Sequence, residues 1–115
     1  MSGVTTHVLD IANGRPAAGV RIELRRLDGA AATLLKTLHT NADGRTDVPL
    51  LTAGEVRAGQ YEIAFHVGAY FGAAAAADQP FLDVVPVRFG VADPGQHYHV
   101  PLLVSPWSYS TYRGS

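Results

Sequence analysis

Short segments with strand character recur along this chain, and clusters of glycine, proline, asparagine and aspartate separate them. Because strands are short and tight turns need residues that tolerate unusual backbone angles, this spacing is typical of an all-β sandwich or barrel. Segment 20–27 shows the pattern most clearly, since its aliphatic and charged residues alternate and should occupy a buried and a wet face. The aliphatic set is Val20, Ile22 and Leu24, and the charged set is Arg21, Glu23 and Arg25.

The sequence predicts seven or eight strands in two packed antiparallel sheets, together with one short helix. The helix is expected over Ala69–Ala77, which contains five consecutive alanines, because alanine loses no side-chain entropy in a helix. The turn at residues 41–44 should deliver Arg45 to the start of a short strand. The remaining strands are expected over 5–11, 20–27, 34–40, 60–67, 83–91, 96–104 and 107–113.

Composition narrows the class of protein. The 115 residues predict one domain, 1–115, and a content of 47% hydrophobic against 17% charged residues indicates that part of the surface is covered at a subunit interface. A net charge of -1 shows no excess of positive charge of the kind that nucleic-acid binding requires. With no cysteine, disulfides and thiol chemistry are excluded. No apolar run approaches a membrane span and no signal peptide is recognisable, so we expect no membrane contact and a cytoplasmic location.

Two histidines two residues apart are the first candidates for chemistry. Strand alternation places His97 and His99 on one face together with Pro101, while Tyr98 and Val100 take the other face. The pair could be structural, or could share a metal ion, although no third ligand lies near in sequence. Pro101 has no N–H and therefore favours a sheet edge, a bulge or an interface.

Three further features stand apart in the sequence. His7 falls early in the first predicted strand, and a polar residue on a mostly apolar face needs a partner if it is buried. Arg45 follows an Asp-Gly turn, where most arginines are solvated. The segment 107–115 is rich in aromatic and hydroxyl side chains, unlike an ordinary frayed terminus, which indicates packing at an edge or an interface. Taken singly, none of these signals decides a function.

Six stretches of the sequence match one known family: THVLD at 6–10, GRPA at 14–17, DGRT at 43–46, DVVPVRF at 83–89, HYHVPLL at 97–103 and SPWSYSTYRGS at 105–115. Taken together, they closely resemble the 5-hydroxyisourate hydrolase family, also called the transthyretin-related proteins. The tail is the most specific element, because YRGS after SYST separates this family from transthyretin itself, and the match runs nearly end to end.

The resemblance implies a transthyretin-like two-sheet β-sandwich that forms a homotetramer, with active sites in the channel between two dimers. It implies hydrolysis of the N1–C6 amide of 5-hydroxyisourate to 2-oxo-4-hydroxy-4-carboxy-5-ureidoimidazoline in urate degradation, with neither a metal nor an organic cofactor. Carried over by position, the catalytic residues are His7, Arg45, His99 and Tyr112. The same four residues and Ser115 bind substrate, and His97 has a secondary role.

These residue types suit amide hydrolysis, which needs a base for water, stabilisation of an oxyanion and a proton for the leaving nitrogen. An imidazole can supply either proton step, and an arginine can hold an oxyanion. We favour His7 as the base with Arg45 as the oxyanion partner. The rival interpretation is a transthyretin-type carrier that binds an aromatic ligand without chemistry. A protein-interaction module is a third, which leaves YRGS unexplained.

Overall fold

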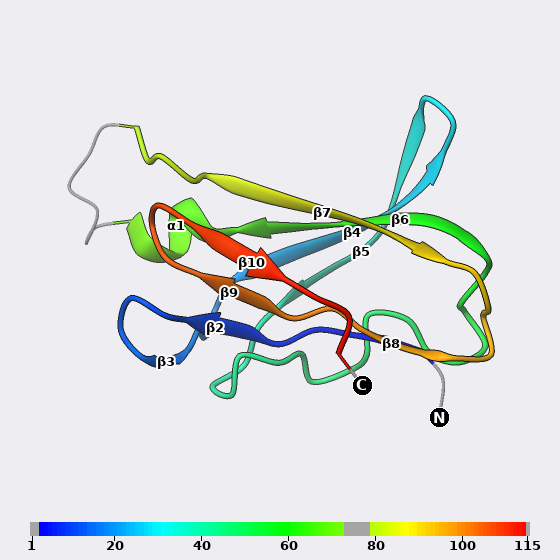
Figure 1. Ribbon diagram of the computed structural model, residues 1–115, viewed down its shortest axis with the longest axis horizontal. Coiled ribbons are helices and arrows are strands. Elements are labelled where there is room, and N and C mark those ends of the chain that lie inside the picture. Colours follow the sequence, from blue (N-terminus) through cyan, green and yellow to red (C-terminus); the bar gives the residue numbers. More distant parts are fainter. Residues whose placement is uncertain (1–2, 73–78, 115) are drawn as a thin grey trace.

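Two layers of β-strands make up the protein, seen in a computed structural model that describes residues 3–72 and 79–114 (Figure 1). The predicted all-β sandwich with one short helix is confirmed. The described residues form ten strands: β1 (Gly3–Thr5), β2 (Val8–Asp10), β3 (Arg15–Pro16), β4 (Arg21–Asp28), β5 (Ala31–His39), β6 (Gly59–His66), β7 (Val84–Val91), β8 (His97–His99), β9 (Leu102–Val104) and β10 (Tyr109–Thr111).

The sheet of longer strands has the order β5-β4-β6-β7 and is antiparallel throughout. Ile22 and Leu24 point into the core as predicted and are fully buried. Glu23, expected on the wet face, is only 8% exposed. Its carboxylate is covered on the outer face by Arg21, Arg25 and His66, so the prediction of a solvated Glu23 was wrong.

The facing layer has the order β10-β9-β2-β3, and the pair β1-β8 continues it beyond a break in each strand. The predicted strands 5–11 and 96–104 are therefore each divided in two. Pro101 lies at one break, where its missing N–H removes no ladder hydrogen bond, and the backbone amides of Val100 and Leu102 still donate to the carbonyls of Thr5 and His7. In contrast to the antiparallel prediction, β1 runs parallel to β8 and β2 runs parallel to β9.

The core between the layers is aliphatic and aromatic, which fits a fold held by packing. Its largest fully buried side chains include Tyr61, Phe65, Ile63, Leu50 and Leu102. Burial of such groups contributes roughly 1.5–3 kcal/mol each, before the entropy cost of ordering the chain.

Two predicted elements differ in the structure. Helix α1 spans Val67–Phe71, so it begins earlier than expected, and residues 73–77, the alanine run, lie outside the described residues. No strand begins at Arg45. Pro49 has no N–H to donate, and only Leu51 reaches another strand, through a single bridge to Val4. None of the helices in the described ranges is long and apolar enough to cross a membrane.

Candidate active site

His7 lies in the break between β1 and β2, and backbone groups of other segments bond to both its carbonyl and its ring. Its carbonyl accepts a hydrogen bond from the Leu102 amide at 2.9 Å, and its ring Nε2 lies 2.8 Å from the Asp43 carbonyl oxygen. A carbonyl can only accept, so Nε2 carries the hydrogen. In the neutral ring, Nδ1 therefore keeps its lone pair, which is the form that a general base requires.

Arg45 is presented by a turn that is fixed to the strand carrying His7. Gly44 has a φ of +77° and its carbonyl accepts from the Val8 amide, and a Cβ added there would lie 2.4 Å from the Val8 oxygen. The Asn41 side-chain oxygen accepts from the amides of both Asp43 and Arg45. Only glycine fits this close approach, so the turn holds the base of Arg45 beside His7 while the side chain stays exposed.

His97 and His99 share a face of β8, as alternation predicts, and both contact a residue of β1. The Thr5 hydroxyl oxygen lies 3.2 Å from Nε2 of His97 and 2.9 Å from Nδ1 of His99. Burial lowers the pKa of His99 below its ordinary value, and the proximity of Arg45, His7 and His97 lowers it further. The lowered pKa favours the neutral form of His99. Arg45 and His7 lie close enough to influence this pKa.

The C-terminal segment runs beside β8 and β9 at the edge of this sheet. Gly114 donates its amide to the His99 carbonyl at 2.8 Å, and a Cβ at Gly114 would lie 2.5 Å from Cδ2 of the His99 ring. The Thr111–Leu102 and Gly114–His99 pairs share one register, so Tyr112 falls opposite Pro101, on the His99 face. Its side chain is 59% exposed. Ser115 lies outside the described residues.

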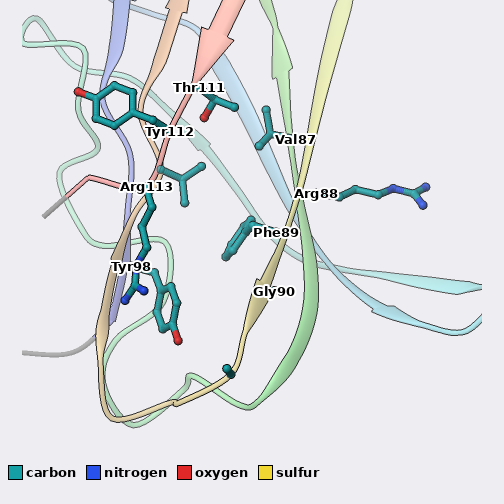
Figure 2. A pocket seen from close by; sticks show the side chains of 10 residues that line it. Val87, Arg88, Phe89, Gly90, Tyr98, Thr111, Tyr112 and Arg113 are labelled. Atoms are coloured by element: carbon teal, nitrogen blue, oxygen red, sulfur yellow. The ribbon is translucent and has the colours of Figure 1, made fainter.

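A groove of about 340 Å³ lies on the other side of β8, between β7 and the C-terminal segment (Figure 2). Its lining includes Phe89 and Tyr98, and the guanidinium carbon of Arg113 is 4.3 Å from the centre of the Tyr98 ring. Figure 2 shows the Tyr112 ring directed away from Phe89. The histidines face the opposite way, so the hollow that adjoins the candidate site is a different one, of about 290 Å³, which Thr5 and Arg45 help to line.

We call the outer face of β1, β2, β8 and β9 the site face. The structure brings His7, His97, His99 and Arg45 together there, and it lays Gly114 against His99. Tyr112 shares the face but makes no side-chain hydrogen bond to the described residues. In the described ranges, no three histidine or carboxylate side chains gather as a metal site would need.

Sequence reasoning missed three contributors to this site: Thr5, the Asp43 carbonyl and Gly114. Thr5 precedes His7 by two positions and so shares its face, which was a readable signal. Its contact with β8 depends on a parallel pairing that alternation alone does not specify.

A transthyretin-like sandwich whose outer face carries histidines, a turn-borne arginine and a docked C-terminal segment is the class that this fold and site define. The chain belongs to the HIUase/Transthyretin family, whose model matches residues 4–114.

Individual relatives include 5-hydroxyisourate hydrolases and transthyretins. A 5-hydroxyisourate hydrolase of Deinococcus radiodurans is 60% identical over 114 residues, which cover 98% of this chain and 96% of the relative. A crystal structure of (S)-allantoin synthase is 50% identical with a TM-score of 0.90; the match covers 99% of this chain and 44% of that one. Sea bream transthyretin in complex with thyroxine is 31% identical with a TM-score of 0.85, covering 96% and 93% of the two chains.

Proposed function

We propose that this protein is a hydrolase that opens the N1–C6 amide of 5-hydroxyisourate, giving 2-oxo-4-hydroxy-4-carboxy-5-ureidoimidazoline in urate degradation. The observation that carries the proposal is the joint placement of His7, His99 and Arg45 on one face. A backbone carbonyl holds the His7 ring, a hydroxyl holds the His99 ring, and the Asn41 side chain accepts from the Arg45 backbone amide. The 60% identity to a 5-hydroxyisourate hydrolase supports the same activity.

Two residues take the chemical roles, His7 as the base and Arg45 as the oxyanion partner. His7 accepts a proton from water at Nδ1 while the water oxygen bonds to C6. Arg45 stabilises the negative charge that forms on the C6 oxygen, and the C6–N1 bond then breaks as N1 takes up the proton that His7 removed from water. General acid–base assistance of this kind contributes about 10²- to 10⁴-fold to a rate. No step needs a metal or an organic cofactor.

Tyr112 and Ser115 complete the proposed substrate site, with Tyr112 narrowing it and also assisting catalysis. His97 does not contact the substrate in this scheme. Tyr112 lies at the edge of the site face with most of its ring exposed, which leaves it free to contact a ligand on that face.

We also infer that the protein is a cytoplasmic homotetramer in which site faces meet across a channel. Ile11 and Tyr112 are 51% and 59% exposed, and a subunit interface would remove their apolar surface from water. Sedimentation should therefore give the mass of four chains at micromolar concentration. A stable monomer would contradict the tetramer and the interfacial site together.

A transthyretin-type carrier is the alternative function on the same fold. The likeness to the thyroxine-bound sea bream protein supports the fold, but its 31% identity is about half that of the hydrolase relative. The charged and titratable groups of the site face also suit a small polar purine derivative better than a bulky aromatic ligand.

One assay separates the two functions. 5-Hydroxyisourate is generated in place from urate with an oxidase, and its ultraviolet absorbance is followed with and without the protein. We expect decay well above the spontaneous rate. Decay at the spontaneous rate, together with calorimetric binding of thyroxine, would replace the hydrolase with the carrier.

A further inference from the structure

The Thr5 hydroxyl bridges two imidazoles across the β1–β8 pair. Parallel register sets Gly3 opposite His97 and Thr5 opposite His99. As a result the Thr5 oxygen reaches Nε2 of His97 at 3.2 Å and Nδ1 of His99 at 2.9 Å. Both distances are within hydrogen-bond range, so Thr5 joins the two rings in one chain of hydrogen bonds.

A hydroxyl has one hydrogen, and among the described residues the Thr5 hydroxyl contacts only these two ring nitrogens. Its hydrogen therefore goes to one ring and its oxygen accepts from the other, so this chain has a direction. In the first arrangement, His97 donates from Nε2 to Thr5, and Thr5 donates to Nδ1 of His99, which leaves the His99 hydrogen on Nε2. In the second, His99 donates from Nδ1 to Thr5, and Thr5 donates to Nε2 of His97. The His97 hydrogen then sits on its Nδ1.

The environment of His97 distinguishes the two arrangements. Its Nδ1 atom is the one side-chain polar atom of the described residues that is buried without a hydrogen-bond partner. The second arrangement would place an N–H there with nothing to accept it, and orphaned buried N–H groups are rarer than underused acceptors. The first arrangement leaves only a bare ring nitrogen at that position.

We propose that Thr5 and His97 are positioning residues that hold His99 in its Nε2–H form, so that His99 presents a hydrogen-bond donor to the substrate. The assignment of a role in turnover rests on the hydrolysis proposed above. The two rings then have different roles. The Asp43 carbonyl leaves His7 with a free lone pair on Nδ1, which can accept a proton, whereas the Thr5 hydroxyl occupies the Nδ1 lone pair of His99 and leaves it a donor at Nε2. His7 removes the proton from water, and His99 donates a hydrogen bond to the C6 oxygen or to N1 without giving up its own hydrogen.

The electrostatics of His99 agree with this role. Burial lowers its pKa, and the nearby Arg45, His7 and His97 lower it further. The lowered pKa favours the neutral ring, and a neutral imidazole with a fixed tautomer can donate a hydrogen bond without itself carrying charge. Protonating His99 would place a hydrogen on Nδ1, facing the Thr5 hydroxyl hydrogen, and would reverse the chain of hydrogen bonds.

Long-range ¹H–¹⁵N correlation spectra of the intact protein test the tautomers without substrate. The chain has five histidines, and the signals of two are assigned by their loss in His97→Gln and His99→Asn. We expect both rings to carry hydrogen on Nε2. A hydrogen on Nδ1 of His99 would overturn the proposal.

Substitution of Thr5 then tests the consequence for turnover. Thr5→Val keeps the β-branched shape but removes the hydroxyl, so the His99 spectrum should become a mixture of tautomers. We expect kcat to fall about 10- to 100-fold, the range known for outer partners of functional imidazoles, with KM little changed. Thr5→Ser restores the hydroxyl and should recover most of the rate.

Thr37→Val is the matched control, since Thr37 is an exposed threonine of β5 with no side-chain hydrogen bond to the described residues. It should leave both the spectrum and the rate unchanged. If Thr5→Val behaves like this control, then the bridge does not position His99. If wild-type protein shows the expected tautomers but no hydrolysis, the proposed function fails while the assignment of tautomers stands.

Discussion

His66 and His99 occupy opposite outer faces of the sandwich and have opposite surroundings. His66 Nε2 lies 2.7 Å from the Glu23 carboxylate, and Arg21 and Arg25 contact the same carboxylate at 3.1 and 3.4 Å. We call these four residues the paired cluster. His99 contacts no carboxylate in the described residues, and its ring contacts the Thr5 hydroxyl close to Arg45 and two further histidines.

The difference separates a structural histidine from one available for chemistry. In the paired cluster, the arginines and His66 all contact the Glu23 carboxylate. His66 therefore has a structural role, because its ring links β6 to β4. On the site face, His7 and His99 contact only uncharged partners, which fix the orientation of the rings while leaving one ring nitrogen free.

The largest expected effect comes from His99→Asn, which removes the titratable ring of the site face. The rate of 5-hydroxyisourate hydrolysis should fall about 10²- to 10⁴-fold, with an unchanged circular dichroism spectrum. His66→Asn is the matched control in the paired cluster and should keep the rate. Equal losses in the two variants would show that the two faces do not differ in function.

Gly114→Ala tests whether the C-terminal segment must lie against His99. The added Cβ would come within 2.5 Å of Cδ2 of the ring, so the segment or the ring has to move. Because a displacement of about 1 Å can cost roughly 10²-fold in rate, we expect a loss of that order in steady-state kinetics. Gly54→Ala, at a position with nothing within 4 Å, is the control. Full activity in Gly114→Ala would separate the tail from the site.

Glu23→Gln should act on stability and not on catalysis. It leaves His66 and two arginines without their shared carboxylate, and loss of a charge-assisted hydrogen bond costs about 1.5–3 kcal/mol when buried. Since the arginines are partly exposed, we expect the lower end of this range for the free energy of unfolding, measured in urea. A larger change in kcat than in stability would refute the separation of the two faces.

The two faces should also respond to acid in different pH ranges. The pKa of Glu23 is lowered by its hydrogen bond with His66 and by Arg25 and Arg21. Its stabilisation is therefore complete above the ordinary pKa of 4.5 and is lost as the pH falls through the lowered value. The pKa of His99 is lowered from its ordinary value of 6.5, first by burial and then by Arg45, His7 and His97, so most His99 rings are neutral at pH 6.5. NMR titration of the His99 ring checks this, and a midpoint above 6.5 would contradict it.

Much of the fold could be predicted because its cause is local. Alternation along 20–27 and 60–67 reflects burial on one side, and glycine and proline mark the turns. The parallel pairing of β1 with β8 could not be predicted, since it joins segments from opposite ends of the sequence. Glu23 was misassigned for a related reason: His66, which covers its carboxylate, comes from the next strand of the sheet.

The candidate site was predictable in its residue types but not in its supports. The sequence does indicate four candidate residues by their settings. His7 lies on a mostly apolar strand face, Arg45 follows a tight turn, and His97 and His99 share one strand face. The sequence does not single out Thr5, the Asp43 carbonyl or Gly114, because these are common groups. They matter because of their short distances to His7 or His99 in the folded chain, which the sequence does not show. Resemblance supplied the set of residues, and the structure adds which ring nitrogen each contact leaves free.

The bridge from Thr5 to His99 joins positions that are 94 residues apart in the chain. Contacts of such long range close large loops, whose entropy cost slows folding, and they form only when most of the chain is already ordered. A partly folded chain therefore lacks the assembled site, and it should have no hydrolytic activity. During refolding from urea, recovery of activity should coincide with the last step of assembly, so that turnover reports on completed folding.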